Sequence, residues 1–158
     1  MTETADARAR LRADCSRCAG LCCVVPAFAA SADFVIDKPA GRACPDLRDD
    51  ARCGIHVDLR ERGFRGRTVV DCFGAGQHTV PATFRGGRDW RGDPEVFVAF
   101  GGQRQLHELL RCLTEALALD AAAPLRREVA AAHERTERLT AATALPAGLE
   151  HPPYWGSR

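Results

Sequence analysis

The chain has 158 residues, 46% of them apolar, which is enough for one ordinary domain with its own core. Its 22 basic and 21 acidic residues nearly balance, and neither sign forms a stripe or tail, so the sequence argues against nucleic acid or an anionic membrane as a partner. No run reaches the roughly 18 apolar residues of a membrane span.

One apolar stretch, LCCVVPAFAASA, follows three arginines as the core of a secretion signal would. It is short and Pro26 interrupts it, so we expect a soluble, cytoplasmic protein instead. In that compartment thiols stay reduced, and clustered cysteines bind metal more often than they form disulfides.

Residues 1–12 are rich in alanine and arginine and are interpreted as a flexible or helical lead into a cysteine-rich region, residues 13–76. Seven of the eight cysteines fall in the first 72 residues, and four of them lie in CSRCAGLCC, residues 15–23. If a helix continues through this stretch, Cys15, Cys18 and Cys22 share one face and Cys23 points about 100° away.

The rest of the cysteine-rich region is expected to consist mainly of loops, because prolines and glycines interrupt every periodic pattern. We expect a short strand at residues 34–36, a turn between Cys44 and Cys53, and a short helix at residues 55–62 that Gly63 ends. A β segment at residues 68–70 would then deliver Cys72 into a glycine turn.

Residues 77–92 are interpreted as a linker, and residues 93–142 as an antiparallel helical hairpin. Asp93, Pro94 and Glu95 provide an N-cap, a proline in the first turn and a carboxylate at the positive end of the helix dipole.

We expect Gly101 and Gly102 to break or kink the first helix, which continues over residues 103–119 with a leucine stripe. The second helix covers about residues 122–142, and residues 143–158 form an irregular tail from which Tyr154 and Trp155 dock back. The predicted fold class is therefore mainly α with irregular loops: a small metal-stabilised cysteine-rich region followed by the hairpin.

The cysteine set has the donor chemistry of a metal site. Zinc binds four sulfur or nitrogen donors, and an iron–sulfur cluster usually binds four thiolates. The candidate ligands, which exceed the needs of one such site, are Cys15, Cys18, Cys22, Cys23, Cys44, Cys53, Cys72 and His56. The residues leave open whether the metal is zinc or iron, how many ions bind and which of these donors are ligands.

Two other interpretations of the cysteines remain open. They could form a redox pair or disulfides, although no βαβ pattern surrounds Cys15 and Cys18, and the vicinal Cys22 and Cys23 would form a strained ring. They could also be inert, buried thiols. For Cys112, which stands alone, we expect only a packing or surface role.

Four elements in order, CSRCAGLCC, CPDL from Cys44, CGIH from Cys53 and DCF around Cys72, resemble the CxxCxxCC, or YkgJ-type, family of zinc- or iron-chelating domains. The resemblance covers about residues 13–76 and implies a chelated zinc or iron centre. Here three residues separate Cys18 from the Cys-Cys pair, and His56 takes the place of a tyrosine. With QLHELLRCLTEAL following, the chain is also similar to an N-terminal module of actinobacterial pentapeptide-repeat proteins, without the repeats.

The leading hypothesis is a metal-binding protein whose centre is structural or sequestering. The alternatives are a metalloenzyme with a catalytic iron–sulfur or zinc centre, and a thiol redox sensor or interaction module that binds a protein partner through the hairpin; whether the chain is an enzyme stays undecided. Among the other histidines, we expect His107 and His133 to be solvated and His78 to be only an outside candidate for the site.

Overall fold

The computed structural model of the chain describes residues 2–79 and 93–141. Tyr154 and Trp155, which were expected to dock back, lie outside the described residues. Most of the linker expected at residues 77–92 lies outside them too, but its first two residues, Gln77 and His78, belong to a helix. Within the described residues the fold is mainly helical and has no sheet, which confirms the predicted class of a mainly α fold with irregular loops and a helical hairpin; metal stabilisation of the cysteine-rich region stays a prediction. None of these helices is both long enough and apolar enough to span a membrane.

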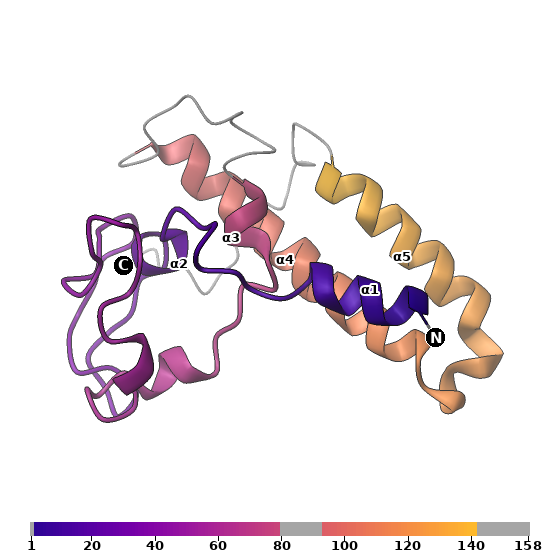
Figure 1. Ribbon diagram of the computed structural model, residues 1–158, viewed down its shortest axis with the longest axis horizontal. Coiled ribbons are helices and arrows are strands. Elements are labelled where there is room, and N and C mark those ends of the chain that lie inside the picture. Colours follow the sequence, from indigo (N-terminus) through magenta and orange to yellow (C-terminus); the bar gives the residue numbers. More distant parts are fainter. Residues whose placement is uncertain (1, 80–92, 142–158) are drawn as a thin grey trace.

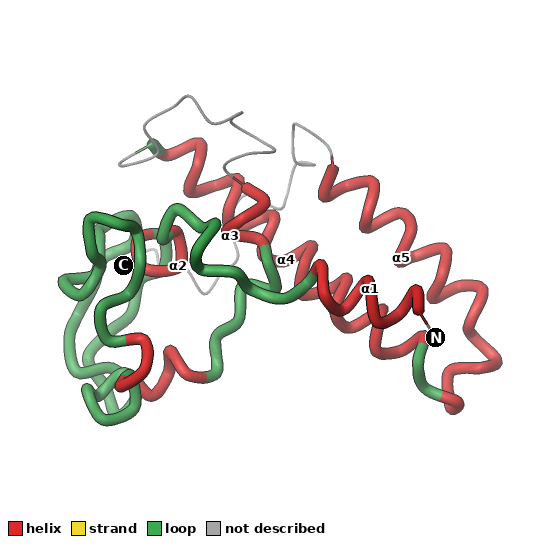
Figure 2. Tube along the Cα trace, in the orientation of Figure 1, coloured by secondary structure: helices red, strands yellow, loops and turns green. Residues whose placement is uncertain are grey.

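Figure 2 shows that the long helices gather in one part of the molecule and the irregular segments in another. The helices are α1 (Thr2–Arg10), α2 (Leu21–Val24), α3 (Ala75–His78), α4 (Pro94–Leu117) and α5 (Arg126–Ala141), with the 3-10 turns η1 (His56–Asp58), η2 (Arg65–Thr68) and η4 (Asp120–Leu125). In the described ranges β pairing is limited to two isolated antiparallel bridges, Phe28 with Lys38 and Leu47 with Cys53.

Helix α4 is the central element, since α1, α3 and α5 all pack against it (Figure 1). Its start is as predicted: Pro94 occupies the first turn, and Asp93 accepts a hydrogen bond of 3.0 Å from the backbone N–H of Glu95. The turn η4 then reverses the chain, and α5 lies along α4 as the second arm of a hairpin.

The expected break at Gly101 and Gly102 is wrong, because α4 is continuous from Pro94 to Leu117. Each glycine costs about 1 kcal/mol of helix propensity relative to alanine, which the packing of a long amphipathic face outweighs. Both glycines are buried, as are their neighbours Phe100 and Gln103, so the helix is enclosed by packing at this point.

The buried face of α4 also differs in part from the predicted leucine stripe. Leu106 and Leu110 are buried as expected, whereas Leu109 is 47% exposed. The face is completed by polar side chains, Gln103, His107 and Thr114, which recur at helical spacing and are all nearly inaccessible to solvent.

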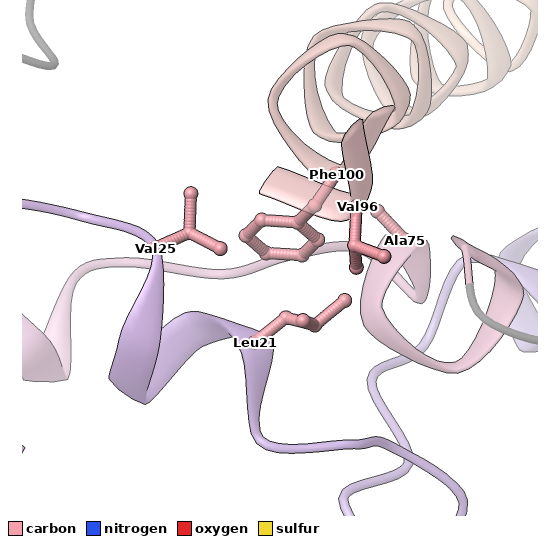
Figure 3. Close-up of a cluster of buried hydrophobic side chains, with 5 residues drawn as sticks. All are labelled: Leu21, Val25, Ala75, Val96 and Phe100. Carbon is pink, nitrogen blue, oxygen red and sulfur yellow. The ribbon is translucent and has the colours of Figure 1, made fainter. Parts of the chain in front are cut away.

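Two small cores hold the cysteine-rich region together. In the first, Leu21 and Val25 from the α2 segment pack with Ala75 of α3 and with Val96 and Phe100 in the first turns of α4 (Figure 3). Cys22 and Cys72 pack at its edge. This core therefore attaches two cysteine-bearing segments to the start of the helical hairpin.

The second core consists of Ile55, Leu59 and Phe64, with Phe28 and Phe34 packed against them. The strands expected at residues 34–36 and 68–70 are wrong: the first lies beside a single bridge and the second overlaps η2. In the part of the chain that the structure describes, neither segment has a partner strand to supply a hydrogen-bonded ladder. The helix expected at residues 55–62 is instead the turn η1 followed by further turns. Gly63 ends this series of turns, as expected, in the left-handed conformation at φ 83°.

The helix expected through Cys15, Cys18 and Cys22 is also wrong. Turns occupy residues 15–18, and α2 starts only at Leu21 because Gly20 has φ 73°, in the left-handed region. A Cβ at Gly20 would lie 2.9 Å from the carbonyl oxygen of Ala51. Glycine is therefore required where the segment of residues 15–23 meets the turn before Cys53.

Candidate metal centre

Six of the seven clustered cysteines line one cavity of about 390 Å³. They come from three separated stretches of the chain, and a candidate nitrogen donor from η1 lines the same cavity. The candidate ligands at this cavity are Cys15, Cys18, Cys22, Cys23, Cys53, Cys72 and His56. We call it the thiol cavity.

Helix α3 holds one wall of the thiol cavity in place. The Gln77 side chain accepts a hydrogen bond of 2.6 Å from the backbone N–H of Asp14 and donates one of 3.1 Å to the carbonyl oxygen of Arg12, so it fixes the approach to Cys15. A Cβ at Gly76 would lie 2.5 Å from the Cys18 sulfur, a distance that real Cβ atoms do not adopt. Gly76 therefore leaves the space that the Cys18 thiol occupies.

The turn between Cys44 and Cys53 is as predicted, and the Leu47–Cys53 bridge closes it. It presents Cys53 to the thiol cavity, but Cys44 does not line that cavity. The Cys44 backbone N–H donates a hydrogen bond of 2.9 Å to the carbonyl oxygen of Cys23, and its thiol lies 3.8 Å from the Asp46 carboxylate.

Cys22 and Cys23 are held as a pair by Arg67. Its Nη1 donates a hydrogen bond of 2.7 Å to the carbonyl oxygen of Cys22, and its Nη2 lies 3.9 Å from the Cys23 sulfur. Hydrogen bonding from the Cys23 thiol and the nearby guanidinium charge lower the pKa of Cys22 to about 6, and the same hydrogen bond raises the pKa of Cys23. The guanidinium therefore favours a single negative charge shared by the Cys22–Cys23 pair.

Cys15 and Cys18 are harder to ionise than an ordinary thiol while no cation neutralises them. Burial, followed by the charge on Cys22, raises the pKa of Cys18 to about 11 and raises that of Cys15. Negative charge on Cys22 thus opposes ionisation of Cys15 and Cys18, as expected of thiols close enough to share one cation.

The buried side chain of Lys38 lies close enough to Cys23 and Cys44 for its charge to interact with theirs. The Lys38 ammonium donates hydrogen bonds of 2.8, 3.2 and 2.7 Å to the carbonyl oxygens of Val24, Pro39 and Arg42. Burial lowers its pKa to about 8, and negative charge on Cys44 opposes that change. The chain's single lysine therefore cross-links the loop that follows α2.

All eight cysteines are free thiols, and Cys112 is exposed on α4, as expected of a surface residue. Among residues 2–79 and 93–141, no three Cys, His, Asp or Glu side chains surround a common point as metal ligands. The candidate ligands thus share a cavity, and forming a coordination sphere from them requires side-chain rotation. Their assignment as ligands stays a prediction.

The expectation that His107 and His133 are solvated is wrong. His107 is 6% exposed, and its Nδ1 lies 2.7 Å from the carbonyl oxygen of Phe73. His133 retains 14% side-chain exposure, and its Nε2 lies 3.1 Å from Thr114 Oγ1. The signal for His107 is its position four residues after Gln103 and three before Leu110 on the buried face, which a search for leucines alone misses.

Comparison with known proteins identifies one homologue, uncharacterized protein YybG of Bacillus subtilis. The two sequences are 48% identical over an alignment of 134 positions, which covers 82% of this chain and 48% of the relative. The chain therefore spans about half the length of the curated relative that it matches. No family model matches the chain. No solved structure matches it either.

Proposed function

We propose that the chain binds a thiolate-ligated metal centre in the thiol cavity, as zinc or as an iron–sulfur cluster, with a structural or sequestering role. The observation that carries the proposal is that six thiols and one imidazole, from stretches separated by up to 57 residues between Cys15 and Cys72, line one cavity of about 390 Å³. An inert buried cysteine acts only as a small apolar side chain, so packing alone would not be expected to bring six of them to one cavity.

The donor set fits either centre. Zinc needs four sulfur or nitrogen donors and a cluster needs four thiolates, so the cavity has enough of each. A bound cation would stabilise the thiolate forms of Cys15 and Cys18, whose ionisation their neighbours now oppose. The order of CSRCAGLCC, CGIH and DCF, as in the CxxCxxCC family, supports the same function.

The surplus of donors favours a fully coordinated centre over a catalytic one, which would keep a position open for substrate. Because the ligands come from loops that two small cores hold together, metal binding would contribute directly to the stability of this region. Binding of a protein partner through the hairpin remains a separate proposal; its exposed apolar side chains include Leu109, Leu119 and Leu125.

The test is anaerobic purification followed by elemental analysis, a labile-sulfide assay and a visible spectrum. Brown protein with iron and sulfide identifies a cluster, and colourless protein with bound zinc identifies a zinc centre. A folded chain that contains no metal and takes up none with its thiols reduced would contradict the proposal.

A matched pair of serine variants locates the centre. Cys53→Ser should lose the thiolate-bound metal, whereas Cys112→Ser should retain it, because Cys53 lines the thiol cavity and Cys112 is exposed on α4. The readout is the thiolate-to-metal charge-transfer absorption of the cobalt-substituted protein. Equal loss in both variants would argue against a centre in this cavity.

A further inference from the structure

A second cavity, of about 270 Å³, contains three histidines from three helices: His78 of α3, His107 of α4 and His133 of α5. Glu137, one turn beyond His133, lines it as well. Its walls include no cysteine, and it shares no lining residue with the thiol cavity. We call it the histidine cavity.

The tautomer of His107 follows from its hydrogen bond. A carbonyl oxygen can only accept, so the Nδ1 that lies 2.7 Å from the Phe73 carbonyl carries the proton and the lone pair is on Nε2. That Nε2 is buried and has no hydrogen-bond partner among the residues that the structure describes, and the whole residue is only 6% exposed. A metal-bound histidine has this arrangement, one ring nitrogen donating to a carbonyl and the other presenting its lone pair.

His78 adds a second unsatisfied nitrogen beside the first. Its Nδ1 is also buried and finds no partner within residues 2–79 and 93–141. The centroids of the His78 and His107 rings are 5.3 Å apart with 56° between their planes. Two imidazoles that share one tetrahedral ion, each at about 2.0–2.1 Å, have centroids roughly 5 Å apart. The separation of the two rings thus suits a common ion.

The carboxylate of Glu137 lies near one ring nitrogen of His133. The Nδ1 of His133 lies 3.7 Å from Glu137 Oε2, which is too far for a hydrogen bond but places a carboxylate where a small side-chain rotation would make it the outer partner of a metal-bound histidine. The other carboxylate oxygen of Glu137 lies 3.5 Å from the guanidinium of Arg10, so α1 contacts this carboxylate as well. The Nε2 of His133 lies 3.1 Å from the hydroxyl of the buried Thr114.

We propose that His78, His107 and His133 bind a divalent transition-metal ion such as Zn²⁺ in the histidine cavity. Three imidazoles without a thiolate suit zinc, nickel or ferrous iron, and solvent completes the coordination. The rings do not yet surround one point, and His133 completes the site by rotating its Nε2 away from Thr114. This site is independent of the thiol centre.

The test uses the full-length, reduced protein, whose thiols are first loaded by stoichiometric addition of Zn²⁺ that leaves the histidines free, and which is then titrated with Co²⁺. We expect one further Co²⁺ per chain with the visible bands of a nitrogen- and oxygen-ligated ion and no thiolate charge transfer. His78→Ala and His107→Ala should abolish this uptake while circular dichroism shows them folded, and His56→Ala, in the other cavity, should retain it.

A second variant keeps the proposal testable if a histidine variant fails to fold. Thr114→Val removes the hydroxyl that competes for His133, so Co²⁺ should bind about fivefold tighter. Absence of the additional Co²⁺ in the wild-type chain, unchanged uptake in folded His78→Ala and His107→Ala, or unchanged or weaker binding in Thr114→Val would each overturn the proposal.

Discussion

Arg67 and Cys22, 45 positions apart in the chain, are joined by a hydrogen bond of 2.7 Å from the guanidinium Nη1 to the backbone carbonyl oxygen. The bond ties the turn η2 to α2, and it places a fixed cation beside the Cys22–Cys23 pair. The segment with the highest density of cysteines thus depends for its position on a residue well outside it.

Replacing Arg67 with methionine should therefore destabilise the protein by about 1.5–3 kcal/mol, the usual range for a hydrogen bond from a charged group in a partly buried setting. The measurement is denaturant unfolding of the metal-free chain. Arg65→Met is the matched control, since Arg65 is on the same turn but exposed, and it should change stability by no more than about 0.5 kcal/mol. Similar losses in both variants would show that the hydrogen bond to Cys22 is unimportant.

Gly20 and Ala51 form a second matched pair, because both have left-handed backbones, at φ 73° and 63°. Gly20→Ala should destabilise the fold by more than the roughly 1–2 kcal/mol of the conformation alone, since its Cβ would also lie 2.9 Å from the Ala51 carbonyl oxygen. Ala51→Gly should instead be neutral or stabilise by up to about 1 kcal/mol. Thermal unfolding of the two variants measures both effects, and a harmless Gly20→Ala would contradict the close approach of these two loops.

Metal removal by a chelator under reducing conditions should loosen residues 11–74 and leave most of the α4–α5 hairpin intact. Residues 11–74 are held together by only two small apolar cores, whereas α4 and α5 pack directly on each other. Hydrogen exchange should rise in the loops and in the first turns of α4, where Val96 and Phe100 contact Leu21. Equal loss of protection throughout α4 and α5 would mean that the whole chain unfolds as one unit.

The contact of α1 with α4 should depend on acid pH. Arg8 donates hydrogen bonds of 2.9 and 2.7 Å to the two carboxylate oxygens of Glu115, which lowers the pKa of that carboxyl below its ordinary 4.5. Because the folded pKa is the lower one, the contribution of the pair is fully present above pH 4.5 and disappears as the pH falls through the folded pKa.

Glu115→Gln should therefore lower the thermal midpoint slightly at neutral pH, and the difference from the wild type should vanish at strongly acid pH. The exposed Glu134→Gln on α5 serves as the control and should leave the neutral midpoint unchanged. A difference between wild type and Glu115→Gln that stays constant down to acid pH would exclude this ion pair as its origin.

The helical half could be predicted in outline because its signals are local. Asp93 and Pro94 start α4 by satisfying backbone groups within one turn, and apolar residues at helical spacing mark its length. The break expected at Gly101 was wrong because propensity is a weak local term, whereas burial depends on what lies opposite. The same reasoning explains His107, whose polarity suggested solvent although α3 and α5 cover it.

By itself the amino-acid sequence determined the donors: the cysteines, their early position and their grouping are properties of residue type and spacing. Only the tertiary structure decided which of them meet. It placed Cys53 and Cys72 with the Cys22–Cys23 pair and left Cys44 outside the thiol cavity. The reason is that irregular loops have no repeating hydrogen-bond pattern from which direction can be inferred; contacts between distant residues, such as Gly20 with Ala51, set their course.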